Sequence, residues 1–264
     1  MSGWLDTIAS TPLGGIFVTI LGLIWGSFFN VLILRVPHEK SLIPRSRCQK
    51  CAAPIPWYLN VPVVSYLVLR GKCRSCRAHI SIQYPLVEIA TALLYFWLYV
   101  HFGLGIRFLA YAIFLSLLLV ISVIDLYHQI IPDEMSLPGI LVGIAFALFT
   151  HDISWQDSLM GTAVGGGIFL GIAVLYEKLS GREGLGGGDV KLLAMIGAWL
   201  GVKSILPVVI VSSALGSIVG IAIMVLQRKD FKTAIPFGPF LSLGAVACLF
   251  WGQFILDTIF PQIP

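Results

Sequence analysis

Three carboxylates lie within or at the edge of long apolar stretches of this 264-residue sequence. Glu88 lies in "YPLVEIATALLYF", Asp125 ends "LLLVISVID", and Asp189 follows the glycines of "GLGGGDVKLL". An ionisable side chain inside an apolar segment is costly and by default marks a functional position. Two carboxylates that share one proton can activate a water molecule and protonate a peptide carbonyl oxygen. Since no serine or cysteine with a convincing histidine partner competes as a nucleophile, these acids indicate acid–base hydrolysis.

A run of glycines precedes Asp189 in the sequence. Without side chains, these residues let a substrate backbone approach the acid closely, and they permit backbone geometries that other residues resist. A flexible linker is the alternative, although flexibility alone does not require an adjoining acid. The run does not match a dinucleotide-binding fingerprint, because no strand precedes it and Asp189 fills the third glycine position. The four residues are Gly184, Gly186, Gly187 and Gly188.

Two Cys-x-x-Cys pairs, "CQKC" at 48–51 and "CRSC" at 73–76, are separated by 21 residues. Four thiolates from two such pairs suit a closed tetrahedral zinc site. The sequence therefore predicts a structural zinc ion that staples a loop too small to build a large core. Labile disulfides or inert thiols are the alternatives, and prolines between the pairs predict short extended segments rather than helices. The predicted ligands are Cys48, Cys51, Cys73 and Cys76, and the remaining Cys248 is predicted to be a small core residue.

The elements that must position these residues are membrane helices. The sequence is 58% hydrophobic and only 11% charged, with a mean hydropathy of +0.93, which excludes an ordinary soluble domain. A span needs roughly 20 apolar residues and must satisfy its own backbone hydrogen bonds. We therefore predict an all-α polytopic membrane protein with about eight transmembrane helices and a small zinc-stapled cytosolic loop domain. The predicted spans are 13–34, 84–101, 107–126, 134–150, 158–178, 189–201, 204–226 and 236–256.

Basic residues fall almost entirely on one side of these spans. Of 17 Lys and Arg, 15 lie in segments that one topology places together, nine of them between Arg35 and Arg77, and only Arg107 and Lys203 lie opposite. Because cytosolic loops collect such residues, the cysteine loop is predicted to be cytosolic and the N-terminus external. The net charge of +4 follows from these loops and does not indicate nucleic-acid binding.

The predicted organisation has three parts: a first span at 1–34, a cytosolic four-cysteine loop domain at 35–83, and a transmembrane core at 84–264. By hydropathy alone, a signal peptide is the alternative for the first apolar segment. Residues 1–12 contain no Lys or Arg, whereas a signal peptide begins with positive charge. We therefore expect a retained span.

In this topology Asp125 and Asp189 both lie at cytosolic ends of their helices. On helices that pack together they could form a dyad that shares a proton. Interfacial acids also cap helices, and Asp189 could cap the sixth span, but the adjacent glycines favour catalysis. A helix dipole favours an anion at the helix start and disfavours one at its end. We therefore expect Asp189 to be the more readily ionised acid and Asp125 the more readily protonated one.

Three further polar residues lie near the ends of predicted spans. Asp133, after Pro132, is predicted to cap the fourth span. Lys191 is predicted to be an interfacial anchor, or else to steady charge at the dyad. Asn30, with Gly26 and a serine on the same helical face, predicts close helix packing.

These motifs, in this order, resemble those of the bacterial type IV prepilin peptidases, and the resemblance covers nearly the whole chain. The similar stretches are "GSFFNVLILRVP", the paired cysteine loop with "NVPVVSYLVLRGKC", "YPLVE", "D…IPD", "GLGGGDVKLLAMIGAWLG" and "PFGPFLSLG". The resemblance implies a GxGD-type aspartyl protease of the bacterial inner membrane that cleaves the leader of prepilins or pseudopilins after a glycine, at the cytosolic face. It implies Asp125 and Asp189 as the catalytic pair and the four cysteines as metal ligands.

The resemblance also implies that the new amino terminus, often phenylalanine or methionine, is methylated by S-adenosylmethionine. No strand–glycine–helix pattern marks a site for that cofactor, so its binding rests on family likeness alone. We expect Gly71, Lys72 and Glu88 to contribute to it. Since basic leaders and a basic loop repel each other, the loop is expected to face anionic lipid headgroups.

Three other functions remain open at this point. A transporter would use buried acids for ion coupling, although its site would lie at the midplane and no internal repeat is evident. An assembly scaffold would use the zinc loop for docking and the aspartates as caps. A general intramembrane protease would share the GxGD acid.

Overall fold

The computed structural model describes residues 12–43, 46–150, 152–181, 186–227 and 236–259. Within these ranges the chain is helical and contains no strand, only two isolated β-bridges in the loop. The chain divides into two compact units, Met1–Val120 and Ile121–Pro264. The division falls inside helix α5, Ile106–His128. Residue Gly184 and the N-terminal segment used above to exclude a signal peptide lie outside the described residues, except for Pro12.

Seven described helices are long and apolar enough to cross a membrane. They are α2 Pro12–Arg35, α4 Gln83–Phe102, α5, α6 Asp133–Thr150, α7 Trp155–Ser180, α9 Ile205–Gln227 and α10 Gly238–Ile259. The prediction of an all-helical polytopic membrane protein is confirmed.

The predicted span at 189–201 differs from the other seven. It corresponds to α8, Gly187–Leu200, whose 14 residues extend about 21 Å, less than the roughly 30 Å of a hydrocarbon core. Every side chain from Leu192 to Trp199 is buried. This helix is apolar because it lies against α6, α7, α9 and α10, and its hydropathy reports burial in protein rather than a full crossing.

In the first unit, small residues bring α2 and α4 together. A Cβ atom on Gly22 would lie 2.6 Å from the Cα of Ala92, and one on Gly26 would lie 2.6 Å from the Cα of Glu88. Asn30 is 2% exposed, and its Nδ2 donates hydrogen bonds to the carbonyl oxygens of Gly26 and Tyr84. The predicted role of Asn30 and Gly26 in close helix packing is confirmed.

The loop between these two helices contains short helical elements. They are the 3₁₀ turn η2, Trp57–Leu59, and the one-turn helix α3, Val64–Val68. The expectation of extended segments here was therefore wrong for this part of the loop. Val63, the N-cap of α3, has φ of 60° and ψ of −48°, and such a positive φ is unusual for a β-branched residue.

In the second unit, glycines bring α7 and α8 into backbone contact. A Cβ atom on Gly161 would overlap the carbonyl oxygen of Gly197, and one on Gly197 would overlap that of Gly161. Close approach through small residues is the usual way in which helices associate in a membrane. Trp199 fixes α8 against α6, since its Nε1 donates to the Gly139 carbonyl oxygen at 2.9 Å.

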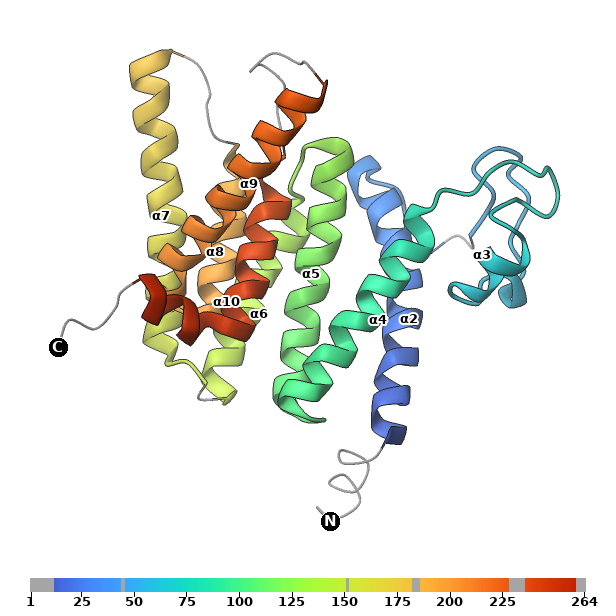
Figure 1. Cartoon of the computed structure of the whole chain (residues 1–264), viewed down its shortest axis with the longest axis horizontal. Coiled ribbons are helices and arrows are strands. Elements are labelled where there is room, and N and C mark those ends of the chain that lie inside the picture. Colours follow the sequence, from blue (N-terminus) through green and yellow to red (C-terminus); the bar gives the residue numbers. More distant parts are fainter. Residues whose placement is uncertain (1–11, 44–45, 151, 182–185, 228–235, 260–264) are drawn as a thin grey trace. The chain divides into compact units, whose positions relative to one another are not determined.

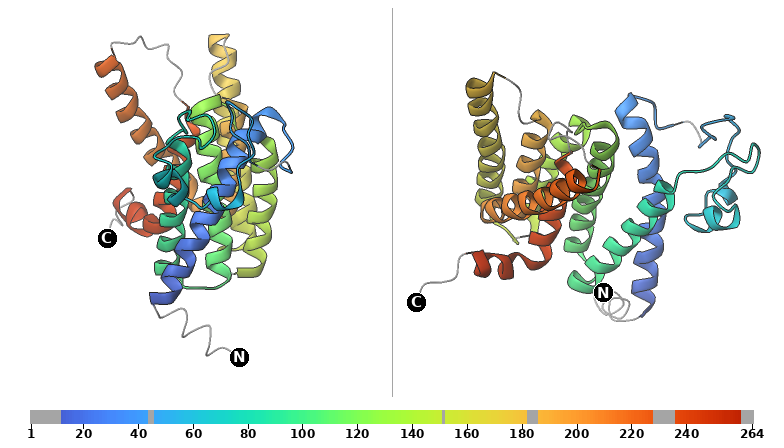
Figure 2. Two further views of the ribbon diagram at one scale, coloured as in Figure 1. Left: turned by 90° about the vertical axis from the view of Figure 1, so that its right-hand side faces the viewer. Right: turned by 45° about the horizontal axis from the view of Figure 1, so that its top comes forward.

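The last helix of this unit, α10, is bent near its C-terminal end. Trp251 interrupts it with φ of −128° and ψ of 21°, and the final turns run at a steep angle to the first part in two orientations (Figures 1 and 2). The straight first part of α10, beginning at Gly238, is the part that meets the site described next.

Candidate functional site

Asp125 lies in the last turns of α5 and is 5% exposed. Its Oδ2 atom accepts a 2.9 Å hydrogen bond from the backbone N–H of Gly238, the first residue of α10. A Cβ atom at position 238 would lie 2.6 Å from that oxygen. The N-terminal end of α10 can therefore approach the carboxylate this closely only with glycine at this position.

Asp189 lies in the first turn of α8, outside the seven candidate spans, and is half-buried. Burial, and then the charge of Asp125, raise its pKa to about 6. The two carboxylates are thus close enough to interact electrostatically. The N-cap of α8 is Gly186, which has no side chain, and Asp189 is the third residue of the helix. Asp189 is therefore not the N-cap of α8, which was the alternative to a catalytic role.

Each of the two acids has a neighbour or an environment that the helix-dipole argument does not include. The N–H of Gly238 stabilises a negative charge on Asp125 directly, and a hydrogen bond to the charged form favours that form. The pKa of Asp189 is about 6, because burial and then the charge of Asp125 raise it. The hydrogen bond and burial act on the two acids in addition to the helix dipole, which contributes typically 0.3–1 kcal/mol.

The glycines before Asp189 serve close packing as well as access. A Cβ atom on Gly188 would lie 2.8 Å from the Cβ of Ile131, in the segment between α5 and α6, whereas one on Gly187 would meet nothing within 4 Å. Gly188 therefore allows the segment between α5 and α6 to contact the start of α8. Gly187 leaves open space near Asp189.

An ion pair joins the first turns of α6 and α8. The Nζ of Lys191 lies 2.6 and 2.7 Å from the two carboxylate oxygens of Asp133. Both side chains are partly exposed. Asp133 is the first residue of α6, and its carboxylate binds this lysine. Lys191 therefore links the N-terminal ends of two helices near the acids, in addition to lying near a helix end as predicted.

The four predicted metal ligands come together in the first unit. The Sγ atoms of Cys48, Cys51, Cys73 and Cys76 all lie within 4.8 Å of one another. The Cys48 and Cys76 sulfurs are 3.8 Å apart, and zinc–sulfur bonds of about 2.3 Å in a tetrahedron place sulfurs at about that separation. Backbone N–H groups of Cys51 and Lys50 lower the pKa of the Cys48 thiol to about 6. This donor set could hold a metal ion. The fifth cysteine, Cys248, is buried in α10 as predicted.

Two equivalent turns hold these cysteines. In the first, the N–H of Cys48 donates to the Ala53 carbonyl oxygen, and in the second the N–H of Cys73 donates to that of Ala78. The residue after each pair is left-handed: Ala52 has φ of 57° and Arg77 has φ of 55°. The loop therefore repeats one knuckle twice, a feature that the matching spacing of the two pairs already indicated.

Gly71 and Lys72, expected at a methyl-donor site, belong to the second of these knuckles. Gly71 has φ of 66° and its carbonyl oxygen accepts from the N–H of Ile80. Lys72 pairs with His79 in an isolated β-bridge. No hydrogen bond or ion pair among the described residues joins either of them to Glu88. The structure thus gives both residues a clear structural role in the knuckle.

Glu88 connects its helix to the start of α3. Glu88 is 7% exposed, and its Oε2 accepts a 2.7 Å hydrogen bond from the N–H of Val63. That bond supports the positive-φ backbone of Val63 described above. Glu88 therefore ties the loop to α4.

One residue of the carboxylate site was absent from the set chosen from the sequence. Gly238 lies 113 positions from Asp125, so local pattern could not connect them. The glycine between prolines in "PFGPF" was the available signal, since a glycine at a helix start often marks a close backbone approach.

The fold and these two clusters define a multi-pass membrane protein with a carboxylate pair where α5, α8 and α10 meet, and with a four-thiolate loop. The chain belongs to the type IV leader peptidase family. The model of that family matches residues 112–221, which contain both aspartates. The model of the bacterial peptidase A24 N-terminal domain matches residues 20–102, which contain the four cysteines.

Curated relatives match over most of the chain. A prepilin leader peptidase/N-methyltransferase of Pseudomonas aeruginosa is 37% identical over 279 residues, covering 96% of each chain. Proteins of the same name from Myxococcus xanthus and Stutzerimonas stutzeri are 42% and 36% identical and cover 81% and 94% of this chain, and 64% and 95% of their own. No solved structure matches the chain.

Proposed function

We propose that this chain cleaves the leader peptide of prepilins or pseudopilins with Asp125 and Asp189 as the catalytic pair. The observation that carries the proposal is the electrostatic interaction between the two buried or half-buried carboxylates, which come from helices 64 positions apart in the sequence. Family membership and the names of the relatives supply the reaction class and the substrate class.

The two acids take different roles in the proposed mechanism. Ionised Asp125, held by the Gly238 N–H, accepts a proton from a water molecule as that water attacks the scissile carbonyl carbon. Protonated Asp189 donates its proton to the carbonyl oxygen. The resulting diol intermediate collapses when the proton on Asp125 passes to the leaving amine and Asp189 recovers its own, so the pair again holds one proton.

The proposed location is the bacterial inner membrane, with the pair facing the cytosol. The 15 basic residues that share one side of the predicted topology support this orientation. A substrate whose apolar helix lies in the bilayer presents its cleavage point at the depth of helix ends such as those of α5 and α8. Anionic lipid headgroups are the proposed partners of the basic loop.

Zinc is the proposed ion of the thiolate cluster. Four sulfurs at mutual distances within 4.8 Å suit a closed structural site, in which a metal supplies folding free energy and performs no chemistry. The proposed ligands are the same four cysteines. An ion there would hold the two knuckles together and with them the segment that begins at Gly71.

The second proposed activity is methylation of the new amino terminus. S-adenosylmethionine, when bound, supplies an electrophilic methyl group, and Gly71, Lys72 and Glu88 remain the proposed residues near it. A buried carboxylate suits a cationic sulfonium group, and a lysine suits the carboxylate of the cofactor. Substitution of Glu88 with Gln tests this site, and full methylation by that variant would remove Glu88 from it.

The decisive experiment gives purified protein a prepilin that carries its leader and identifies the product N-terminus by mass spectrometry. Asp125→Asn and Asp189→Asn are each expected to reduce the cleavage rate by about 10⁴-fold or more. Asp257→Asn, a change to an exposed carboxylate of α10, is the matched control and should cleave normally. Undiminished cleavage by either active-site variant would refute the proposal. Added S-adenosylmethionine should increase the product mass by one methyl group.

A further inference from the structure

The short helix α3 of the cysteine loop has an exposed apolar face. The exposed side chains are spaced by three and four residues, so they lie on one side of the helix: Val64, Leu67 and Val68. Leu67 is 67% exposed and Val68 is 73% exposed. A contiguous exposed apolar surface usually marks a binding site for a protein or a membrane. The apolar face of α3 therefore requires a partner.

The other sides of α3 pack against the loop itself. The ring of Tyr66 lies against Gly71, since a Cβ atom on Gly71 would lie 3.0 Å from the Tyr66 Cζ. The Oγ of Ser65 accepts a 3.1 Å hydrogen bond from the N–H of Val61. Both Tyr66 and Ser65 are half-buried. The apolar face of α3 is therefore the side that points away from the loop that supports it.

The turn before α3 adds two aromatic rings and a guanidinium group. Trp57 is 84% exposed, and its ring meets that of Tyr58 edge-on, with the centroids 5.9 Å apart. The Nη1 of Arg74 donates a 3.3 Å hydrogen bond to the Tyr58 hydroxyl. Tryptophan and tyrosine concentrate at membrane–water interfaces, and arginine reaches anionic headgroups from such positions. This combination is typical of an element that lies on a membrane.

A hydrogen bond fixes the depth of α3 beside a membrane-spanning helix. The N-cap of α3, Val63, donates its N–H to Glu88 Oε2 at 2.7 Å. Glu88 is the sixth residue of α4, about 8 Å along its axis from its start. The Nε2 of Gln49 also donates to the Tyr84 hydroxyl, at 3.2 Å. Figures 1 and 2 show the loop that carries α3 to the side of the first turns of α4. α3 thus begins alongside a candidate span rather than beyond its end.

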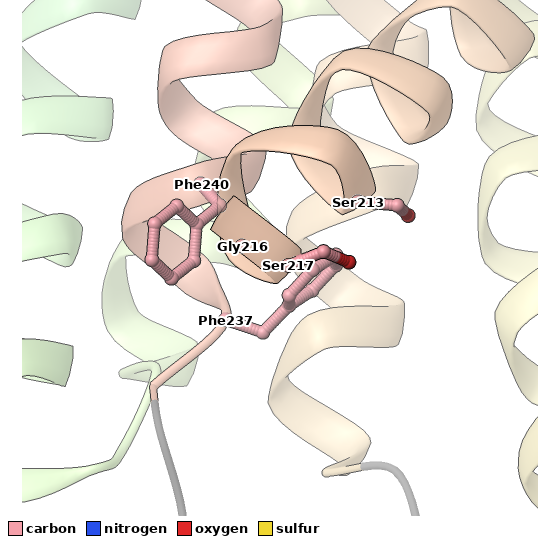
Figure 3. A pocket seen from close by; sticks show the side chains of 5 residues that line it. All are labelled: Ser213, Gly216, Ser217, Phe237 and Phe240. Carbon is pink, nitrogen blue, oxygen red and sulfur yellow. The ribbon is translucent and has the colours of Figure 1, made fainter. Parts of the chain in front are cut away.

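Exposed apolar surface elsewhere in the described chain has a simpler explanation. Figure 3 shows an example, a hollow of about 320 Å³ between α9 and the start of α10 with the rings of Phe237 and Phe240 in its lining. Both helices are long enough to cross a membrane, so lipid chains meet their outer surfaces. α3 has only five residues and cannot cross, so the exposure of its apolar face needs a separate explanation.

We propose that α3 lies in the headgroup region of the bilayer and inserts its apolar face, Val64, Leu67 and Val68, toward the acyl chains. Trp57 anchors the preceding turn at the same depth. Interfacial helices of this kind insert their apolar side by about 5–10 Å. Part of the cysteine loop is then a membrane-embedded element rather than a wholly cytosolic domain. The assignment rests on the proposed membrane orientation and does not depend on leader cleavage.

The apolar helix of a prepilin is the other partner that such a face would suit. Charge favours lipid over this substrate. Arg70 directly follows the C-cap of α3, and Arg74 binds the aromatic turn. These cations attract anionic headgroups, whereas they repel the basic leader that a prepilin carries next to its apolar helix.

The first test locates Trp57 in the full-length protein, reconstituted in nanodiscs that contain phosphatidylglycerol and no substrate. The difference in emission between wild-type protein and Trp57→Phe isolates this residue from the other tryptophans of the chain. Lipids brominated on their acyl chains should quench the difference signal by about half or more, and aqueous iodide should quench it weakly. Strong quenching by iodide without quenching by brominated lipid would overturn the proposal.

The second test changes the apolar face itself. Leu67→Ser combined with Val68→Ser should reduce the lipid quenching of Trp57 by about twofold or more and accelerate trypsin cleavage after Arg70. The matched control makes the same kind of change at two exposed positions of α7, Leu175→Ser with Leu179→Ser, and should alter neither measurement. Undiminished lipid quenching in the α3 variant would show that this face does not hold the loop on the bilayer.

The remaining outcomes separate this inference from the alternatives. If Trp57 becomes shielded from iodide only after a prepilin is added, the apolar face binds substrate and membrane docking is refuted. If wild-type protein shows lipid quenching but cleaves no prepilin, the proposed function alone fails. If it cleaves prepilin normally while brominated lipid does not reach Trp57, this inference alone is refuted.

Discussion

The backbone N–H of Gly238 donates a 2.9 Å hydrogen bond to Oδ2 of Asp125. The bond connects the start of α10 to the end of α5 and fixes one carboxylate oxygen. It also stabilises the charged form of Asp125. The geometry of the carboxylate pair thus depends on a residue that carries no side chain.

Gly238→Ala should therefore impair cleavage strongly. A Cβ atom 2.6 Å from Asp125 Oδ2 must displace the carboxylate or the start of α10, and misplacement by about 1 Å can cost about 100-fold in rate. We expect kcat to fall by about that factor, with little change in thermal stability. Gly252→Ala is the control, because a Cβ atom there meets nothing within 4 Å. Equal activity of the two variants would contradict a positioning role for Gly238.

The pH dependence of cleavage should reflect Asp189. Its pKa is raised from 3.8 to about 6, so Asp189 keeps a proton well above the range of a free aspartate and loses it as pH rises through about 6. Because the proposed mechanism needs one proton on the pair, kcat/KM should decrease on the alkaline side of that value. A value of kcat/KM that continues to rise as the pH increases through about 6 would contradict this assignment.

Asp125→Asn should lower the pKa of Asp189. The charge of Asp125 is one of the two causes that raise it, and asparagine removes that charge but not the burial. The pH dependence of carbodiimide modification of Asp189, measured by mass spectrometry, should move to lower pH than in the wild-type protein. An unchanged profile would show that burial alone sets the pKa.

Lys191 and Asp133 should matter more for rate than for stability. Their side chains are 39% and 52% exposed, and exposed ion pairs contribute only about 0–1 kcal/mol to the free energy of unfolding. The pair nevertheless joins the first turns of α6 and α8, two residues from Asp189. Lys191→Met and Asp133→Asn should each reduce kcat several-fold and change the melting temperature little. The exchanged pair, Asp133→Lys with Lys191→Asp, should recover part of the lost rate.

Metal removal should open the loop and leave the helical core intact. Elemental analysis should find about one zinc per chain, and chelation or Cys48→Ser with Cys73→Ser should expose residues 46–82 to protease, because the two knuckles then lose their common ligand. Cys248→Ser, in α10, is the matched control and should keep its metal. Retention of zinc by the double variant would contradict the four-thiolate assignment.

The sequence by itself determined the helical membrane fold, the four-thiolate loop and the two acids. Hydropathy over 20 residues, the Cys-x-x-Cys spacing and carboxylates in apolar stretches are local patterns with few physical explanations. Hydropathy could not distinguish α8 from a span, because burial in protein and burial in lipid select the same side chains.

Only the tertiary structure decided which groups surround each acid. Helix dipoles alone could not describe the environment of Asp125, because that environment includes Gly238, 113 positions away. The Lys191–Asp133 pair likewise joins residues 58 positions apart. Contacts between distant helix ends arise from packing of the whole unit, so the sequence of any single helix cannot predict them.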